Sequence, residues 1–299
     1  MEMYQILLFL CHEISCKNVI DIYAQKVYIR YKPVAKSTKE DTVDLNLKGK
    51  TTIVTGGSKG IGAGICEVFA QEGSNLVINY HSDAAPAEQM CRDFAEKYGI
   101  KAVCVKGNVG SEEDVKRIFD VAEENFGTVD VLVNNAGRGG TKLVQDMTIE
   151  EWNASLNDNL TGQFLMSREF ARRIIPTGKP GSIVNILSKA TRTSTTKGRV
   201  GYVANKAGEE GLVHALAVDL TEHKIRVNGV MPGFVLAHTL LDQQQNNPEE
   251  FERRVNRVPI KRVGQPWEIG TMCAFLASDK CELAVGTVVD MTGGLLLGF

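Results

Sequence analysis

Short runs of apolar and β-branched residues alternate along the chain with longer segments of helical period, starting at residue 47. Strands that alternate with helices are typical of a parallel sheet with helices on both faces. The pattern therefore predicts an α/β protein with a doubly wound parallel sheet of about seven strands. The predicted strands are TTIVT (51–55), NLVIN (75–79), KAVCV (101–105), VDVLVNN (129–135), SIVNIL (182–187), IRVNGV (225–230) and GTVVD (286–290).

The first 44 residues follow a different pattern. They contain one short apolar run, ILLFLC (6–11), and then a mixed polar stretch. The run is too short to cross a bilayer, and it lacks the basic start and the small-residue cleavage site of a signal peptide. We therefore expect residues 1–44 to form a weakly ordered or accessory N-terminal extension without stable membrane insertion. Residues 45–299 are expected to form a single domain, because no linker or repeat interrupts them.

The composition favours a protein that acts on small molecules. Of 299 residues, 43% are hydrophobic and 23% are charged, which is typical of a globular domain. The net charge of -2 gives no electrostatic reason to expect nucleic acid as a partner. The seven cysteines include no C-x-x-C pair, so we expect neither a disulfide framework nor a metal site, and a reducing cytoplasm fits best.

The first predicted strand runs directly into a glycine-rich turn, TGGSKGIGAG (55–64), which a helical stretch follows. Gly56, Gly60 and Gly62 leave out side chains where a pyrophosphate must approach the backbone, and the helix N-terminus offers unpaired N–H groups to that anion. A glycine-rich turn alone is a weak signal, but its position after the first strand makes it specific. The turn therefore predicts a Rossmann-type fold with a dinucleotide site.

Further motifs follow that turn in a fixed order. They are T-G-x-x-x-G-x-G (55–62), NNAG (134–137), Ser188 after a strand, Y-x-x-x-K (202–206) and PG (232–233). In this order and spacing the set resembles the short-chain dehydrogenase/reductase family, and the resemblance covers nearly all of residues 47–299. The spacing of the first glycines is similar to the compact reductase form of the family, which disfavours epimerase or dehydratase chemistry.

The motif residues suit the reduction of a carbonyl group. A carbonyl that accepts hydride develops negative charge on its oxygen, so the site needs a hydrogen-bond donor and an acid that delivers a proton. Ser188 and Tyr202 can supply the two. Free tyrosine titrates near pH ~10, and Lys206, on the same helix face, can lower that pKa by roughly one to three units. The resemblance adds Asn159, which would anchor a water that leads to the lysine, so the implied catalytic residues are Asn159, Ser188, Tyr202 and Lys206.

The end of the second predicted strand indicates the choice of cofactor. Family members that prefer NAD usually place a carboxylate there, which binds the ribose hydroxyls and repels a 2′-phosphate. This chain has Tyr80, His81 and Ser82 there, and Lys59 in the glycine turn can reach a phosphate. NADP is therefore favoured, with NAD as the alternative. The resemblance places the cofactor against Gly56, Ser58, Lys59, Gly60, Ile61, Gly62, Tyr80, His81, Ser82, Asn108, Val109, Asn135, Ala136, Gly137, Tyr202, Lys206, Pro232, Gly233 and Val235.

The sequence leaves the substrate and one alternative function open. The expected substrate is a small carbonyl compound or secondary alcohol, of either the 3-oxoacyl or the sugar and polyol type. The alternative is a non-catalytic NADP-sensing protein on the same scaffold, because a fold does not determine a function. In that case Tyr202 and Lys206 would form only a solvated helix face. The resemblance also implies a homo-oligomer, either a dimer or a tetramer.

Overall fold

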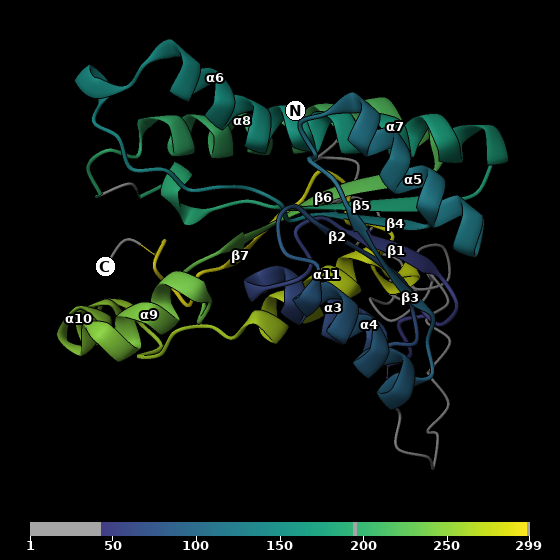
Figure 1. The fold of residues 1–299 in the computed structure, drawn as a ribbon, viewed down its shortest axis with the longest axis horizontal. Coiled ribbons are helices and arrows are strands. Elements are labelled where there is room, and N and C mark those ends of the chain that lie inside the picture. Colours follow the sequence, from purple (N-terminus) through teal and green to yellow (C-terminus); the bar gives the residue numbers. More distant parts are fainter. Residues whose placement is uncertain (1–42, 194–195, 298–299) are drawn as a thin grey trace, which may run out of the picture. The chain divides into compact units, whose positions relative to one another are not determined.

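The structure, a computed structural model, describes residues 43–193 and 196–297 (Figure 1). Apart from its last two residues, the predicted extension, residues 1–44, lies outside the described residues, so its accessory role stays a prediction. All seven predicted strands lie in the described part. None of the helices described there is long and apolar enough to cross a membrane.

The seven strands form one sheet in which every neighbouring pair is parallel. The Rossmann-type fold and the predicted number of strands are thereby confirmed. The strand order reverses between β1 and β4, and in such sheets a crevice opens at the carboxyl ends of the strands at this point. In spatial order the strands are β3 (Ala102–Lys106), β2 (Asn75–Tyr80), β1 (Thr51–Val54), β4 (Val131–Asn134), β5 (Gly181–Ile186), β6 (Ile225–Pro232) and β7 (Val288–Met291).

Helices cover both faces of the sheet (Figure 1). One face carries α3 (Gly60–Gln71), α4 (Ala85–Tyr98) and α11 (Pro266–Ala277). The other face carries α5 (Glu112–Phe126), α7 (Gly162–Ile174) and α8 (Val200–Leu220). The remaining helical segments are α6 (Ile149–Leu156), α9 (His238–Asn246), α10 (Pro248–Arg257), η1 (Val144–Asp146), η2 (Asn157–Thr161), η3 (Ile175–Thr177), η4 (Lys189–Thr191), η5 (Thr221–His223) and η6 (Asp279–Cys281).

The central strands are buried on both sides, which is why they read as continuous apolar runs. Ile53 and Leu132 pack in the core beneath α5, α7 and α8. Val54 and Val133, the next residue in each strand, pack in the core beneath α3 and α11. Because successive strand residues point to opposite faces, one run of apolar residues supplies both cores.

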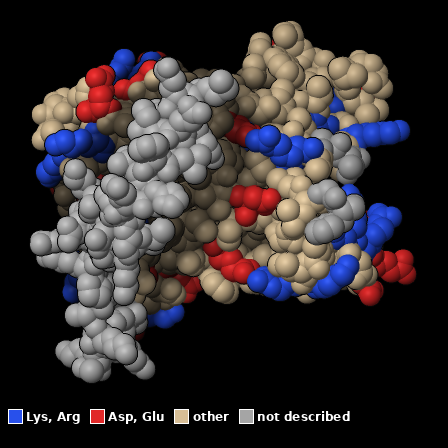
Figure 2. All heavy atoms as spheres, turned by 180° about the vertical axis from the view of Figure 1, so that it is seen from behind, with Lys and Arg blue, Asp and Glu red and all other residues tan. Residues whose placement is uncertain are grey.

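Charged side chains of both signs lie on the surface. On the face drawn in Figure 2, acidic side chains are interspersed with basic ones. Arg173 at the end of α7 joins two helices, because it contacts Asp120 at 2.7 Å and Glu123 at 2.6 Å on α5, and Glu169 at 2.8 Å on its own helix. This network fixes α5 against α7.

The chain between β6 and α11 runs outside the sheet, and its two ends lie side by side. The Leu236 N–H donates to the Gly264 carbonyl at 2.8 Å, and the Gly264 N–H donates to the Phe234 carbonyl at 2.8 Å. Helices α9 and α10 lie between these two ends, and no residue of α10 is buried. We call residues 234–264 the outer segment.

Helices α3 and α11 approach closely because two glycines lie at their contact. A Cβ on Gly64 would lie 2.4 Å from the Cβ of Pro266, and a Cβ on Gly270 would lie 2.7 Å from the Gly64 carbonyl oxygen. Neither position admits a methyl group unless backbone atoms move. The contact holds α3, which begins in the glycine turn, against the helix that follows the outer segment.

Gly64→Ala should lower the free energy of unfolding by about 1 to 3 kcal/mol, because the added methyl overpacks the contact with Pro266. Denaturant unfolding measures this change. Gly211→Ala is the matched control: Gly211 lies inside α8 with nothing within 4 Å of an ideal Cβ. Alanine there should raise the free energy of unfolding by up to about 1 kcal/mol. Unchanged stability of the Gly64→Ala variant would contradict the close approach of the two helices.

A chain that starts at residue 45 should fold and turn over substrate within a few-fold of the full chain. The reason is that every motif of the site lies after residue 45. Circular dichroism and cofactor turnover of the truncated chain test this expectation. If the truncated chain fails to fold, the N-terminal extension is part of the domain.

Candidate active site

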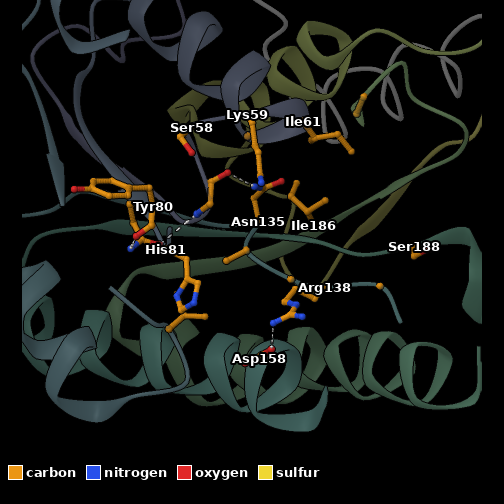
Figure 3. Close-up of a pocket in the computed structure, with 18 of the residues that line it drawn as sticks. Ser58, Lys59, Ile61, Tyr80, His81, Asn135, Arg138, Asp158, Ile186 and Ser188 are labelled. Atoms are coloured by element: carbon orange, nitrogen blue, oxygen red, sulfur yellow. Dashed lines mark hydrogen bonds and ion pairs between the residues drawn. The ribbon is translucent and has the colours of Figure 1, made fainter. Parts of the chain in front are cut away.

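A cavity of about 910 Å³ opens at the carboxyl ends of the strands. Figure 3 shows Tyr80 and His81 on one side of it, Ser58 and Lys59 above them, and Ser188 at the opposite end. The cavity therefore joins the predicted cofactor residues to the predicted catalytic residues. The predicted residues that line it are Gly56, Ser58, Lys59, Ile61, Gly62, Tyr80, His81, Ser82, Asn108, Val109, Asn135, Ala136, Gly137, Ser188, Tyr202, Lys206, Pro232 and Gly233.

The glycine turn has the shape that a pyrophosphate needs. Gly56 and Gly60 adopt left-handed conformations with φ of 60° and 57°, which glycine reaches without strain. A Cβ on Gly62 would lie 2.3 Å from the Gly56 carbonyl oxygen, so only glycine fits there. Lys59 at the N-cap of α3 makes no side-chain capping hydrogen bond. The first N–H groups of α3 can therefore bind an anion in the cavity, which fits a dinucleotide cofactor.

Two side chains tie the glycine turn to the NNAG segment. The Thr55 hydroxyl accepts the N–H groups of Asn135 and Ala136, both at 2.9 Å. The Asn135 amide donates to the carbonyl of Thr55 at 2.9 Å and to that of Gly56 at 3.1 Å. The ends of β1 and β4 are thus connected by four hydrogen bonds that involve side chains.

The end of β2 presents no free carboxylate at the three positions that sequence analysis identified, Tyr80, His81 and Ser82. Asp83 follows them and also lines the cavity. Its Oδ1 accepts the Ala85 N–H at 3.1 Å, at the start of α4.

The segment after β3 is held by a carboxylate. Asp114 Oδ2 accepts the Asn108 N–H at 2.7 Å. This hydrogen bond and the Arg117 side chain hold the pKa of Asp114 below its ordinary value. The Asn108 Oδ1 accepts the Gly110 N–H at 2.9 Å, which closes a tight turn. Asn108 and Val109 therefore reach the cavity from a fixed backbone.

Ser188 and Tyr202 face the same cavity from different elements. Ser188 lies just after β5, and its hydroxyl accepts the Ala190 N–H at 3.2 Å. Tyr202 lies in the first turn of α8. The Arg199 guanidinium lies 4.1 Å from the centre of the Tyr202 ring, a cation–π contact that no motif predicted.

Lys206 is buried, with 5% of its surface exposed, although it also reaches the cavity. Its Nζ donates to the Ile186 carbonyl at 2.8 Å and to Glu209 Oε2 at 2.7 Å. The Y-x-x-x-K motif pairs Lys206 with Tyr202 and does not include Glu209. The spacing of three residues on one helix was the available signal, since such residues share a face.

Asn159 lies behind the cavity and does not line it. It belongs to η2, a π-helical segment, which is a form frequent at functional sites. The Asn159 amide donates to the Ser155 carbonyl at 2.8 Å, and its Oδ1 accepts the Arg138 N–H at 3.0 Å. Asn159 therefore holds the backbone that follows the NNAG segment, next to the wall that Gly137 forms.

Two other predicted residues lie away from the cavity. Gly60 lines a separate hollow between α3, α4 and α11. Val235 is buried, and its side chain packs in the core beneath α3 and α11. Their predicted contacts with a cofactor stay predictions.

The cavity wall also contains polar residues that were not predicted from the sequence. Asn79 is buried in β2, accepts the Gly56 N–H at 3.3 Å and donates to the Gly107 carbonyl at 3.0 Å. A polar residue in an otherwise apolar strand was the signal that could have identified it. Arg138 and Asp158, paired at 3.5 Å in Figure 3, come from segments far apart in the sequence and gave no such signal.

Positive charge gathers at the start of η4, the turn that follows the predicted catalytic serine. Lys189 Nζ lies 4.7 Å from the centre of the Phe234 ring, and Arg254 Cζ lies 5.6 Å from the same centre. Burial lowers the pKa of Lys189, and the charges of Arg257 and Arg254 lower it further. Glu250 balances part of this charge through its contact with Arg254 at 3.0 Å.

Comparison with known proteins identifies the family. The family model described as enoyl-(acyl carrier protein) reductase matches residues 56–296. Glucose 1-dehydrogenase 2 of Bacillus subtilis is 33% identical over 253 residues, which cover 84% of this chain and 96% of that protein. A 3-oxoacyl-(acyl-carrier-protein) reductase of Aquifex aeolicus is 34% identical over 254 residues, which cover 85% of this chain and 100% of that protein.

A solved structure agrees with these relatives. The L-sorbose reductase of Gluconobacter frateurii, complexed with NADPH and L-sorbose, superposes with a TM-score of 0.79 at 26% identity. The match covers 86% of this chain and 100% of that chain. The chain therefore belongs to the short-chain dehydrogenase/reductase family. This membership confirms the resemblance that the motifs predicted. The protein is an NAD(P)-dependent oxidoreductase that acts on CH–OH or C=O groups. The relatives therefore favour an enzyme over a non-catalytic sensor.

Proposed function

We propose that the protein is an NADP-dependent oxidoreductase that interconverts a carbonyl group and a secondary alcohol, with Tyr202 as the proton donor. One observation carries this proposal. Ser188, Tyr202 and Lys206 line the same cavity as the glycine turn, although they come from separate segments of the chain. A carbonyl carbon between the two groups of residues could receive hydride while its oxygen faces Ser188 and Tyr202.

The roles of the side chains follow from their chemistry. When bound, the nicotinamide supplies the hydride or accepts it. The Ser188 hydroxyl donates a hydrogen bond to the substrate oxygen, and the Tyr202 hydroxyl delivers the proton to it. The Lys206 ammonium favours the ionised form of Tyr202 and binds the nicotinamide ribose. Asn159 supports this group from behind, through the backbone after NNAG.

Three observations support NADP over NAD. The end of β2 offers Tyr80, His81 and Ser82 in place of a carboxylate. Asp83, the next residue along the chain, uses one carboxylate oxygen, Oδ1, to accept the Ala85 N–H at 3.1 Å. Lys59 lines the cavity with its ammonium available for a 2′-phosphate. The NADPH in the complex of L-sorbose reductase is in line with this choice.

The substrate is proposed at the level of a class. The relatives bear the names of enzymes that act on glucose, 3-oxoacyl groups and L-sorbose, so the 3-oxoacyl and the sugar or polyol types both stay in the proposal. A panel of substrates for the assay should pair neutral with anionic carbonyl compounds, because positive charge gathers near Ser188. We further propose a cytoplasmic homo-oligomer, either a dimer or a tetramer, in line with the family.

The protein should bind NADPH more tightly than NADH, and Lys59→Ala should reduce that preference by about fivefold. The factor is small because an exposed ion pair contributes up to about 1 kcal/mol. Titration with each cofactor, followed by nicotinamide fluorescence, measures the preference. Lys101→Ala is the control, because Lys101 is exposed, immediately precedes β3 at the amino-terminal end of that strand, and does not line the cavity. Equal affinities of the parent for the two cofactors would refute the proposed specificity.

Tyr202→Phe should reduce turnover by about 10²- to 10⁴-fold, the range for loss of a positioned general acid. Folding and NADPH affinity should be retained, because the substitution removes only one hydroxyl. Nicotinamide absorbance across the panel measures turnover. Tyr98→Phe on α4 is the matched control, because it removes the same hydroxyl outside the cavity. Near-full turnover of the Tyr202→Phe variant would show that Tyr202 is not the proton donor.

A further inference from the structure

Three buried polar side chains meet behind the cavity, on the inner side of α8. Glu209 is 0% exposed, Lys206 is 5% exposed and Gln163 on α7 is 2% exposed. Glu209 Oε2 accepts Lys206 Nζ at 2.7 Å and Gln163 Nε2 at 2.9 Å. The second carboxylate oxygen, Oε1, has no hydrogen-bond partner among the described residues.

Glu209 occupies a position where the helix pattern expects an apolar residue. The buried side of α8 continues through Val213, Ala217 and Leu220, each three or four residues after the previous one. Residues with this spacing face the core of a globular protein. Glu209, four residues before Val213, falls on the same stripe, so a carboxylate stands at a core position.

Stability alone is a poor explanation for this carboxylate. Replacing a buried ion pair with well-packed apolar residues is often neutral or stabilising. Burial raises the pKa of Glu209, and the Lys206 ammonium and the Gln163 amide oppose that rise. The charge of Glu209 therefore depends on the two groups that it touches. Local rules of packing are broken most often at functional sites, and here the broken rule involves the lysine of the site.

We propose that Glu209 is a positioning residue for the reaction: its carboxylate holds the Lys206 ammonium from behind and cancels part of the field that this ammonium exerts at Tyr202. This inference rests on the proposed roles of Tyr202 and Lys206. A lone ammonium favours the phenolate strongly, whereas an ammonium paired at 2.7 Å acts at a distance more like a dipole. The paired lysine should therefore leave Tyr202 protonated to a higher pH, as a proton donor requires.

Several other charged groups near α8 have partners or contacts of their own. On α8, Glu210 pairs with Arg192 of the preceding loop. Arg199 lies over the Tyr202 ring, and Glu151 of α6 pairs with Lys142. Two further titratable groups lie on α8 itself, His214 and Asp219. The segments that pack against α8 carry the others: Asp158 of η2, which pairs with Arg138, Lys189 of η4, Arg226 of β6, and Glu222 and His223 of η5. Helix α6 adds Glu150, and helix α7 adds Arg168, Glu169, Arg172 and Arg173.

Glu209→Gln tests the proposal, because the amide oxygen can still accept the two hydrogen bonds while the charge is removed. The readout is the ultraviolet absorbance of the Tyr202 phenolate against pH. It is obtained as the difference between each protein and the same protein with Tyr202→Phe. The proposal predicts that Glu209→Gln lowers the pKa of Tyr202 by about one unit. Glu210→Gln, a matched change on the same helix, should leave that pKa unchanged.

The titration needs no substrate, so it separates this proposal from the proposed function. If Tyr202→Phe retains full turnover but the titration shifts, the proposed role of Tyr202 fails and the effect of Glu209 on its charge stands. If the titration does not shift, the proposal is overturned even when Tyr202 proves to be the proton donor. For active variants, the acidic limb of the pH profile for alcohol oxidation should move down by the same amount.

A second variant keeps the proposal testable if the Glu209→Gln protein does not fold. Glu209→Leu also removes the charge, and it restores the apolar stripe of α8. It should shift the Tyr202 titration in the same direction as Glu209→Gln. Failure of both variants to fold, judged by circular dichroism, would assign Glu209 to stability and overturn the proposal.

Discussion

The site depends on the hydrogen bonds that connect the end of β1 to the end of β4. Thr55 accepts two backbone N–H groups of the NNAG segment, and Asn135 donates to two carbonyls of the glycine turn. At the point where the strand order reverses, the segments after these strands run to opposite faces of the sheet, so the crevice has no secondary structure across it. Because the side chains satisfy these backbone groups, the turn keeps the shape in which Ile61 and Gly62, in the first turn of α3, line the cavity.

Most of the fold could be predicted because its signals are local. The central strands are short apolar runs buried on both faces, and the segment after β1 holds glycines where the backbone must take left-handed conformations, as at Gly56 and Gly60. The residues of the cavity were assigned through the resemblance to the family, and most of them lie together because motifs at the carboxyl ends of parallel strands lie at one edge of the sheet. The ends of elements are less certain from sequence, and the π-helical turn around Asn159 left no pattern to read.

The unpredicted parts of the site depend on burial and on contacts between distant segments. Glu209 lies in a sequence with another glutamate beside it, and only the packing of α8 decides which of the two is enclosed. The contact of Gln163 with Glu209 joins α7 to α8, two helices between which β5 lies in the sequence. Arg199 approaches the Tyr202 ring because the loop before α8 ends one turn away, and its side chain could equally have faced solvent. Such contacts follow mainly from the three-dimensional arrangement, and for Glu209 the spacing of three residues from Lys206 was the one signal in the sequence.

The outer segment begins and ends at one place, where Gly264 pairs with Phe234 and Leu236. The entropy of closing a loop rises slowly with its length, by about 0.6 kcal/mol for each doubling. A longer or shorter stretch between these hydrogen bonds would therefore change the closure entropy little, and the hydrogen bonds of Gly264 would still hold the two ends side by side. Ala237 of this segment lines the cavity. A change in the length of the outer segment would therefore alter one part of the cavity wall, while the glycine turn and Tyr202, which lie outside the segment, keep their places.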